Sequence, residues 1–197
     1  MDIEYEATFC NINKAEMAQR LLDAGAVLVK KEFLQRRTVF LLPVGNDIPG
    51  AWLRVRDEGD KITMSLKAVL GDKITDQKEI CLTVNDYNQA VKFLASIGCV
   101  QKSYQENRRE IWRLGQAEVT IDEWPFLEPF VEIEAAAENL VKAAAVSLGF
   151  DYTQAIFGST DLLYQKRYGV ALDVINNQTP RIVFDQPNPF LNGKNNF

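Results

Sequence analysis

Two carboxylates at alternate positions near the N-terminus are the first residues whose spacing suggests chemistry. Glu4 and Glu6 lie in the stretch 3–9, in which Ile, Tyr, Ala and Phe occupy the odd-numbered positions. Successive side chains of a strand point to opposite faces, so both carboxylates share one face, about 7 Å apart. On a solvated face the pair has no consequence. Inside a closed barrel the two like charges would need a cation between them, because an uncompensated buried carboxylate is costly.

Charged residues alternate with apolar ones in several other segments. Arg54 and Arg56 share one face of 51–57, and Glu132 and Glu134 share one face of 130–134. For any single pair the commonest explanation is a solvated outer face of an antiparallel sheet. Solvated faces usually mix acids, bases and neutral polar residues, whereas these charges come in blocks of one sign. The acids of the set are Glu4, Glu6, Glu79, Asp122, Glu132 and Glu134, and the bases are Arg54, Arg56, Lys67 and Arg109.

A closed barrel with helices outside would turn the charged faces inward and the apolar faces outward. Enclosed carboxylates would bind a hard divalent cation, Mg²⁺ or Mn²⁺, through oxygen ligands. The arginines and the lysine would bind phosphate oxygens, and the ion would bridge the two sets through the phosphates. This arrangement explains why both signs are present in number.

The order of the elements that must position these residues is an alternation of strands with a few helices. Asn13 is a predicted N-cap and Gly25 a predicted helix stop. The segment 170–197, rich in Asn, Pro and Gln, has no regular period and is predicted to be an irregular tail after a domain at 1–169. Strands are predicted at 3–9, 27–42, 51–57, 62–67, 79–84, 99–113, 117–123 and 130–134, and helices at 15–24, 86–97, 136–148 and 160–168.

A weak internal repeat appears when the chain is laid over itself with a shift of about 73 residues. Glu6 then falls on Glu79, and Arg36 falls on Arg109. In both copies a strand leads through a capped helix into a long strand. A duplication of this kind predicts a barrel of two similar halves.

Composition limits the classes of function. The chain has 197 residues, of which 47% are hydrophobic and 25% charged, which suits one globular domain. It has no histidine, so histidine-based triads and metal sites are excluded. The net charge of −5 argues against a nucleic-acid partner. No stretch is typical of a membrane span or signal peptide, so we expect a cytoplasmic protein with no membrane partner.

Taken in order, these motifs resemble the CYTH, or triphosphate tunnel metalloenzyme, superfamily over roughly residues 2–168. The signature Glu-x-Glu-x-Lys is met by Glu4 and Glu6, and the Leu-x-Arg strand by 53–56. The later lysine, basic strand and acidic elements are met by Lys67, Arg109, Asp122 and 130–134. The resemblance implies an α+β fold, a closed antiparallel eight-stranded β-barrel whose tunnel binds a triphosphate and a divalent metal.

The resemblance implies roles for these residues in hydrolysing a triphosphate or cyclising ATP to cyclic AMP. Hydrolysis would use a water activated by the ion, with Asp122 or one of the glutamates as base, and cyclisation would use the 3′-hydroxyl of ATP. The substrate would be ATP, thiamine triphosphate or tripolyphosphate, and the protein a monomer or a homodimer. The metal ligands would be Glu4, Glu6, Glu132 and Glu134, the phosphate-binding residues Arg54, Arg56, Lys67 and Arg109, and the catalytic residues Asp122, Lys67 and Arg109.

Two positions depart from the family pattern. Thr8 stands where the signature has lysine, and Asn107 stands where a second tunnel lysine is expected. A tunnel with two fewer positive charges should bind a triphosphate less tightly, with Lys31 or Lys166 as candidate replacements. The alternative function is therefore a non-catalytic tunnel that binds polyphosphate or nucleotide. A barrel that binds no ligand is the third possibility.

Several residues stay open at the level of sequence. Arg36 and Arg37 are either tunnel residues or surface charges, and alternation along the strand does not decide between these. Tyr164 is either a lid contact or, as we prefer, a helix anchor. Trp52 and Trp124 are expected to pack in the core or at the rim.

Overall fold

The N-terminal stretch closes a curved antiparallel sheet into a barrel. In the computed structural model, which describes residues 1–191, the stretch forms two short strands, β1 (Asp2–Ile3) and β2 (Tyr5–Phe9). β1 pairs with β6 (Gln77–Val84), and β2 pairs with β9 (Phe130–Ala135). Between them, the Glu4 amide donates to the Gln77 carbonyl over 3.0 Å. One predicted strand thus switches partners at Glu4 and joins both edges of the sheet.

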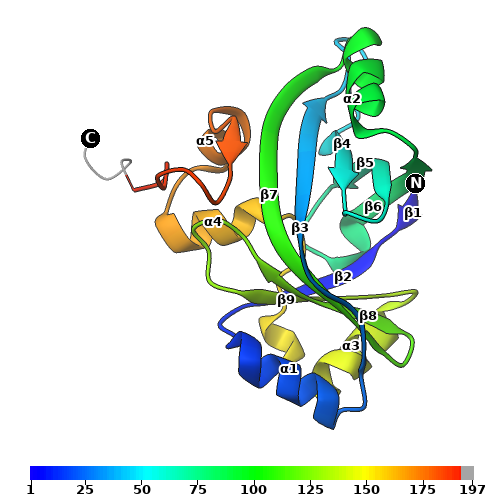
Figure 1. Ribbon diagram of the computed structural model, residues 1–197, viewed down its shortest axis with the longest axis vertical. Coiled ribbons are helices and arrows are strands. Elements are labelled where there is room, and N and C mark those ends of the chain that lie inside the picture. The colour runs from blue at the N-terminus through cyan, green and yellow to red at the C-terminus, as the bar shows by residue number, and fades with distance from the viewer. Residues whose placement is uncertain (192–197) are drawn as a thin grey trace.

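The sheet follows a single path around the barrel. Its order is β1-β6-β5-β4-β3-β7-β8-β9-β2, so it counts nine strands where eight are predicted, because the first strand is divided. The two longest strands, β3 and β7, lie antiparallel through the middle (Figure 1). The remaining strands are β3 (Val27–Leu41), β4 (Ala51–Asp57), β5 (Ile62–Val69), β7 (Val100–Leu114) and β8 (Ala117–Glu123).

Helices cover the outside of the barrel, as predicted. α1 (Lys14–Asp23) and α3 (Glu138–Ser147) lie together beneath β2, β8 and β9, and α2 (Tyr87–Ser96) lies near the opposite end (Figure 1). Asn13 caps α1, since its side chain accepts the amides of Ala15 and Glu16. Apolar residues of the strands, such as Phe9 and Val131, pack against the first helix pair. The apolar faces therefore point out under helices and the charged faces point in.

The segment after the barrel contains regular structure that the sequence pattern did not predict. α4 (Asp161–Tyr168) was predicted, but α5 (Leu172–Asn177) and β10 (Arg181–Ile182) lie in the segment expected to be irregular. β10 pairs with β7 in parallel. Such short elements carry no visible period, and tertiary contacts hold them, including buried Ile175, Ile182 and Phe190. The end of the predicted tail, residues 192–197, lies outside the described residues.

The internal repeat is confirmed in the order of its elements but not in every residue match. β2, α1 and β3 have the same order as β6, α2 and β7. Glu6 and Glu79 both line the interior. Arg36 does not match Arg109, because Arg36 pairs with Asp57 on the exposed side of β3. A register shift in β7 accounts for the difference: Val39 pairs with Ser103 but Phe40 pairs with Gln101, so one extra residue reverses the alternation of β7 between Val100 and Arg109. No helix among residues 1–191 is long and apolar enough to cross a bilayer.

Gln77 is expected to hold the closing seam. Its side-chain amide is buried and donates to the Glu6 carbonyl over 2.9 Å. Gln77→Ala should lower the free energy of unfolding by about 1–3 kcal/mol, because the buried carbonyl loses its donor. Urea unfolding measures the change. Gln101→Ala, at an exposed position on β7, is the control, and equal stability of the two variants would contradict this role.

Candidate functional site

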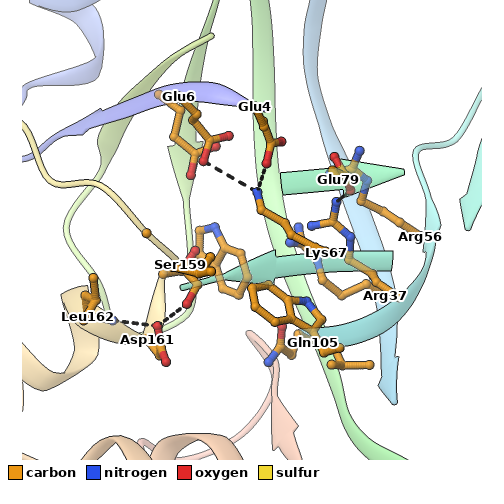
Figure 2. A pocket seen from close by; sticks show the side chains of 18 of the residues that line it. Glu4, Glu6, Arg37, Arg56, Lys67, Glu79, Gln105, Ser159, Asp161 and Leu162 are labelled. Atoms are coloured by element: carbon orange, nitrogen blue, oxygen red, sulfur yellow. Dashed lines mark hydrogen bonds and ion pairs between the residues drawn. The ribbon is translucent and has the colours of Figure 1, made fainter. Parts of the chain in front are cut away.

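The barrel encloses a cavity of about 530 Å³. Charged side chains from β2, β4, β5, β6, β7 and β9 line it, and one side of the view in Figure 2 carries Glu4 and Glu6 while another carries Arg37 and Arg56. Each predicted site residue except Asp122 lies on the cavity wall: Glu4, Glu6, Arg54, Arg56, Lys67, Arg109, Glu132 and Glu134.

Three carboxylates form one group at the acidic part of the wall. Glu4, Glu6 and Glu134 each offer one oxygen, and these oxygens all lie within 4.8 Å of one another. Alternation along β2 and β9 places them there, because the two strands pair antiparallel with Glu6 opposite Glu134. Three converging carboxylate oxygens suit a hard divalent cation such as Mg²⁺ or Mn²⁺.

The pKa values of these carboxyls show the cost of holding them together. Burial raises the pKa of Glu6 well above its ordinary value; Lys67 opposes this, and Glu132, Glu4 and Glu134 add to the rise. Burial and then repulsion by Glu4 raise the pKa of Glu134 from 4.5 to about 7. A bound cation would relieve this repulsion, so the residues present fit a divalent metal.

Lys67 serves as the counterion of the acidic group. Its Nζ lies 2.6 Å from Glu4 Oε2 and 3.8 Å from Glu6 Oε1, as the dashed lines in Figure 2 show. Burial lowers the pKa of Lys67, but Glu6 and Glu4 raise it further, and the net pKa lies above its ordinary value. Lys67 is therefore charged and lies between the carboxylates and the rest of the cavity.

Two arginines of β4 project into the cavity with one carboxylate partner each. Arg54 lies 3.0 Å from Glu79, and Arg56 lies 2.9 Å from Glu58. Burial raises the pKa of Glu79, but Arg54 and Lys67 outweigh it and hold that pKa at about 2. Both arginines remain on the cavity wall, where their guanidinium groups can bind an anion.

Asp122 is not on the cavity wall but behind it. Its Oδ1 accepts from Asn107 over 2.7 Å and from Arg109 Nε over 2.8 Å, and its Oδ2 accepts from Thr120 over 2.7 Å. It is fully buried, with 0% of its surface exposed. These contacts make Asp122 a residue that positions Arg109, which differs from the predicted role as a base.

Glu132 also holds Arg109 and so differs from the other three predicted metal ligands. Arg109 Nη2 donates to Glu132 Oε2. Burial lowers the pKa of Arg109, but Asp122 and Glu132 raise it well above its ordinary value. Arg109 is thus fixed by two carboxylates while its guanidinium lines the cavity.

The structure shows which of Arg36 and Arg37 faces the cavity. Arg37 is buried and lines the cavity, whereas the side chain of Arg36 is 54% exposed and pairs with Asp57. The sequence left Arg36 and Arg37 open because polar side chains lie on both faces of β3, with Gln35 and Arg37 on the cavity wall and Arg36 and Thr38 on the other face. It missed Glu58 because that residue follows the end of β4 in a turn. Lys31 and Lys166, considered as replacements for the absent lysines, are exposed and are not on the wall.

Thr8 and Asn107 occupy the two positions where the family signature has lysine. Thr8 is 5% exposed and lies opposite Glu132 in the β2–β9 ladder. Asn107 is fully buried and accepts from Arg37 through Oδ1 while donating to Asp122. Neither side chain carries a charge, and neither is on the cavity wall.

The sequence profile of the CYTH domain matches residues 3–158. This chain belongs to the CYTH family. No curated protein matches it significantly.

Solved structures share the CYTH fold at low sequence identity. The PH1012 protein of Pyrococcus horikoshii has a TM-score of 0.63 and 20% identity, over 77% of this chain and 93% of that one. A candidate adenylate cyclase of Vibrio parahaemolyticus has a TM-score of 0.70 and 12% identity, over 83% and 98%. A candidate adenylyl cyclase of Hippeastrum with a dominant triphosphatase activity has a TM-score of 0.53 and 16% identity, over 90% and 100%. At these identities the likeness establishes the fold.

Residues beyond the CYTH match complete one part of the cavity wall. Ser159, just before α4, and Asp161 and Leu162, at its start, line the cavity (Figure 2). Tyr164 anchors α4, as preferred from the sequence, because its hydroxyl donates to the Pro125 carbonyl over 2.8 Å. It also touches the cavity. Trp124 packs in the core cluster that includes α4, and both Trp124 and Trp52 line the cavity.

The acidic group should make the metal-free protein less stable as pH rises. The folded pKa of Glu134 is about 7 against an ordinary 4.5, so the folded state retains a proton that the unfolded chain releases. The free energy of unfolding should fall between pH 4.5 and about 7 in EDTA, and Glu134→Gln should flatten this slope. Urea midpoints across this range measure it.

Glu128→Gln, which changes an exposed carboxylate away from the cavity, is the matched control and should keep the wild-type slope. A slope in Glu134→Gln equal to that of the wild type would contradict the assignment.

Proposed function

We propose that this protein is a metal-dependent CYTH enzyme that acts on a triphosphate by hydrolysis or by cyclisation of ATP. The observation that carries the proposal is one cavity in which three carboxylates converge beside a group of arginines. A triphosphate with a divalent cation has the complementary pattern of charge. Membership of the CYTH family supports this reading.

Glu4, Glu6 and Glu134 would hold Mg²⁺ or Mn²⁺. The ion would supply positive charge at the phosphate oxygens, where charge builds up during phosphoryl transfer. Lys67 already balances Glu4 and Glu6 and remains close enough to contact a phosphate between the two charge groups. Glu132, predicted as a fourth ligand, contributes through Arg109 instead.

Arg54, Arg56 and Arg109 would bind the phosphates. Each is held by at least one carboxylate, so its position is set before substrate arrives. Guanidinium groups held in place stabilise a transition state without reorganisation at the moment of reaction. Asp122 and Glu132 serve this purpose for Arg109.

The base for the attacking oxygen is best sought among the carboxyls of raised pKa. Glu134 has a pKa of about 7 without the ion, but an ion bound among Glu4, Glu6 and Glu134 would lower that pKa, so Glu134 serves as a ligand rather than as the base. Asp122 accepts three hydrogen bonds and lacks contact with the cavity. Of the predicted candidates, we therefore retain the glutamates on the cavity wall rather than Asp122 as the base.

The choice between hydrolysis and cyclisation depends on which oxygen attacks. Water leads to phosphate release, and the 3′-hydroxyl of ATP leads to cyclic AMP and pyrophosphate. The structural neighbours of Vibrio and Hippeastrum are described with one or both of these activities, which supports the pair of reactions as candidates here. Assaying phosphate, pyrophosphate and cyclic AMP together from ATP, thiamine triphosphate and tripolyphosphate distinguishes them.

The second candidate is a tunnel that binds a polyphosphate or nucleotide without turnover. Neutral Thr8 and Asn107 favour it, since the signature lysine is linked to catalysis in the CYTH family. This candidate predicts that tripolyphosphate raises the melting temperature while no product forms.

Glu4→Gln with Glu6→Gln should abolish turnover that depends on a divalent ion. The double variant removes two of the three converging oxygen charges, so rates with Mg²⁺ or Mn²⁺ should fall at least about 100-fold, as expected for loss of the metal's electrostatic contribution. Initial rates over a metal titration measure this. Glu128→Gln is the control, and unchanged rates in the double variant would refute the metal role.

Thr8→Lys separates the two candidate functions. A large gain in rate would show that the natural site binds without effective catalysis. In a working enzyme the new lysine would add a buried cation beside Glu132 and Arg109, so we expect a loss of rate. Single-turnover rates with the substrate that the wild-type protein uses or binds best provide the comparison.

A further inference from the structure

Within residues 1–191, one guanidinium on the cavity wall has no carboxylate partner. Arg54 pairs with Glu79, Arg56 with Glu58, and Arg109 with Asp122 and Glu132. Arg37 forms no ion pair with any carboxylate among residues 1–191. It lies on the wall beside these paired arginines, as Figure 2 shows for Arg37 and Arg56.

Neutral groups surround Arg37 instead. Its Nη2 donates to Gln35 Oε1 over 3.1 Å and to Asn107 Oδ1. Its guanidinium carbon lies 4.4 Å from the centre of the Trp124 ring. The Nε hydrogen has no acceptor within the described part of the chain. These contacts fix the direction of the guanidinium, but none of them neutralises its charge.

Burial makes this unpaired charge expensive in the empty protein. Arg37 is only 5% exposed. Burial and then repulsion by Arg54, Arg56 and Arg109 lower its pKa well below the ordinary arginine value, and attraction by Asp122 opposes this only in part. A buried cation that is held in place and left unneutralised suits a site whose anion comes from outside the chain.

We propose that Arg37 forms a phosphate-binding subsite, in which its guanidinium receives one phosphate group of the bound substrate. That the phosphate belongs to a triphosphate rests on the proposed function, whereas the anion site rests on the unpaired guanidinium itself. A multivalent anion is favoured because Arg54, Arg56 and Arg109 surround the same place with further positive charge.

Asn107 is part of this subsite through its amide oxygen. The oxygen accepts from Arg37 while the amide nitrogen donates to Asp122, so the side chain joins the two. A lysine at position 107 could not accept from Arg37 and would add a like charge beside it. Arg37 and Asn107 together thus replace the positive charge that the family pattern places at position 107.

The test compares two neighbouring arginines that differ in the side they face. Arg37→Gln removes the unpaired charge, and Arg36→Gln removes an exposed arginine outside the cavity. Titration calorimetry with tripolyphosphate in EDTA measures binding without a metal. Arg37→Gln should raise the Kd by about 10- to 100-fold, whereas Arg36→Gln should keep the wild-type Kd. The melting temperature of ligand-free Arg37→Gln should not fall, because a buried unpaired charge is lost.

A double variant tests whether Arg37 acts through its charge, because a purely structural role of Arg37 would not be restored by a charge placed on the neighbouring strand. Asn107→Lys alone should raise the Kd for tripolyphosphate. The double variant Arg37→Gln with Asn107→Lys should have a lower Kd than Arg37→Gln alone, because the new lysine on β7 supplies the missing positive charge. No recovery, with both proteins folded, would contradict the exchange. Should Arg37→Gln not fold, Arg37→Lys decides: a several-fold weaker Kd supports the subsite, and an unchanged Kd overturns it.

Inorganic phosphate separates this inference from the proposed function. If wild-type protein binds tripolyphosphate and Arg37→Gln binds it equally well, the subsite is refuted and the proposed function stands. If the wild-type protein neither binds nor turns over triphosphates but phosphate stabilises it through Arg37, the proposed function fails and the anion subsite stands. If phosphate and tripolyphosphate both leave the wild-type melting temperature unchanged, both are refuted.

Discussion

Charge enclosed inside the barrel is the constraint on which the rest of this structure depends. Closing the sheet through the N-terminal stretch brings Glu4 and Glu6 beside Glu134, and no solvated outer face relieves their repulsion. The chain compensates part of the charge itself, with Lys67 against the acids and carboxylates against three arginines. What remains is a group of acids whose pKa values are raised and an arginine without a partner. A metal ion bound to a phosphate chain would neutralise both groups, because the ion would balance the carboxylates and the phosphates would balance the arginine.

The alternation of residue types predicted much of this arrangement because a strand has only two faces. Once the strands form a barrel under helices, Glu4, Glu6, Arg54, Arg56 and Lys67 have one direction available, which the structure confirms. The same logic gave no answer for β3, where polar side chains lie on both faces and the structure shows that Arg37 rather than Arg36 faces inward. It also missed Glu58, which a turn brings to Arg56. Roles were harder to predict than directions, because Asp122 and Glu132 both contact Arg109, a pairing across strands that alternation along one strand does not reveal.

The two lysines missing from the family pattern have different structural consequences. Asn107 joins Arg37 of β3 to Asp122, because its amide oxygen accepts from Arg37 and its amide nitrogen donates to Asp122. The positive charge of Arg37 is therefore held beside position 107. Thr8 lies opposite Glu132 in the ladder, and its side chain carries no charge. In the proposed function, the charge at position 107 would be replaced by Arg37, whereas the charge at position 8 would be lost. The C-terminal segment adds a further difference, since α4 and α5 line the cavity beyond the residues that match the CYTH domain.

The most direct test of this account is to locate the metal and the phosphates by anomalous scattering. Crystals grown with Mn²⁺ and tripolyphosphate, measured at the manganese absorption edge, would show the ion independently of any activity. The account predicts an anomalous peak among Glu4, Glu6 and Glu134, with phosphate density reaching the arginines opposite. Phosphate bound with no manganese at these carboxylates, or manganese bound elsewhere on the protein, would contradict it.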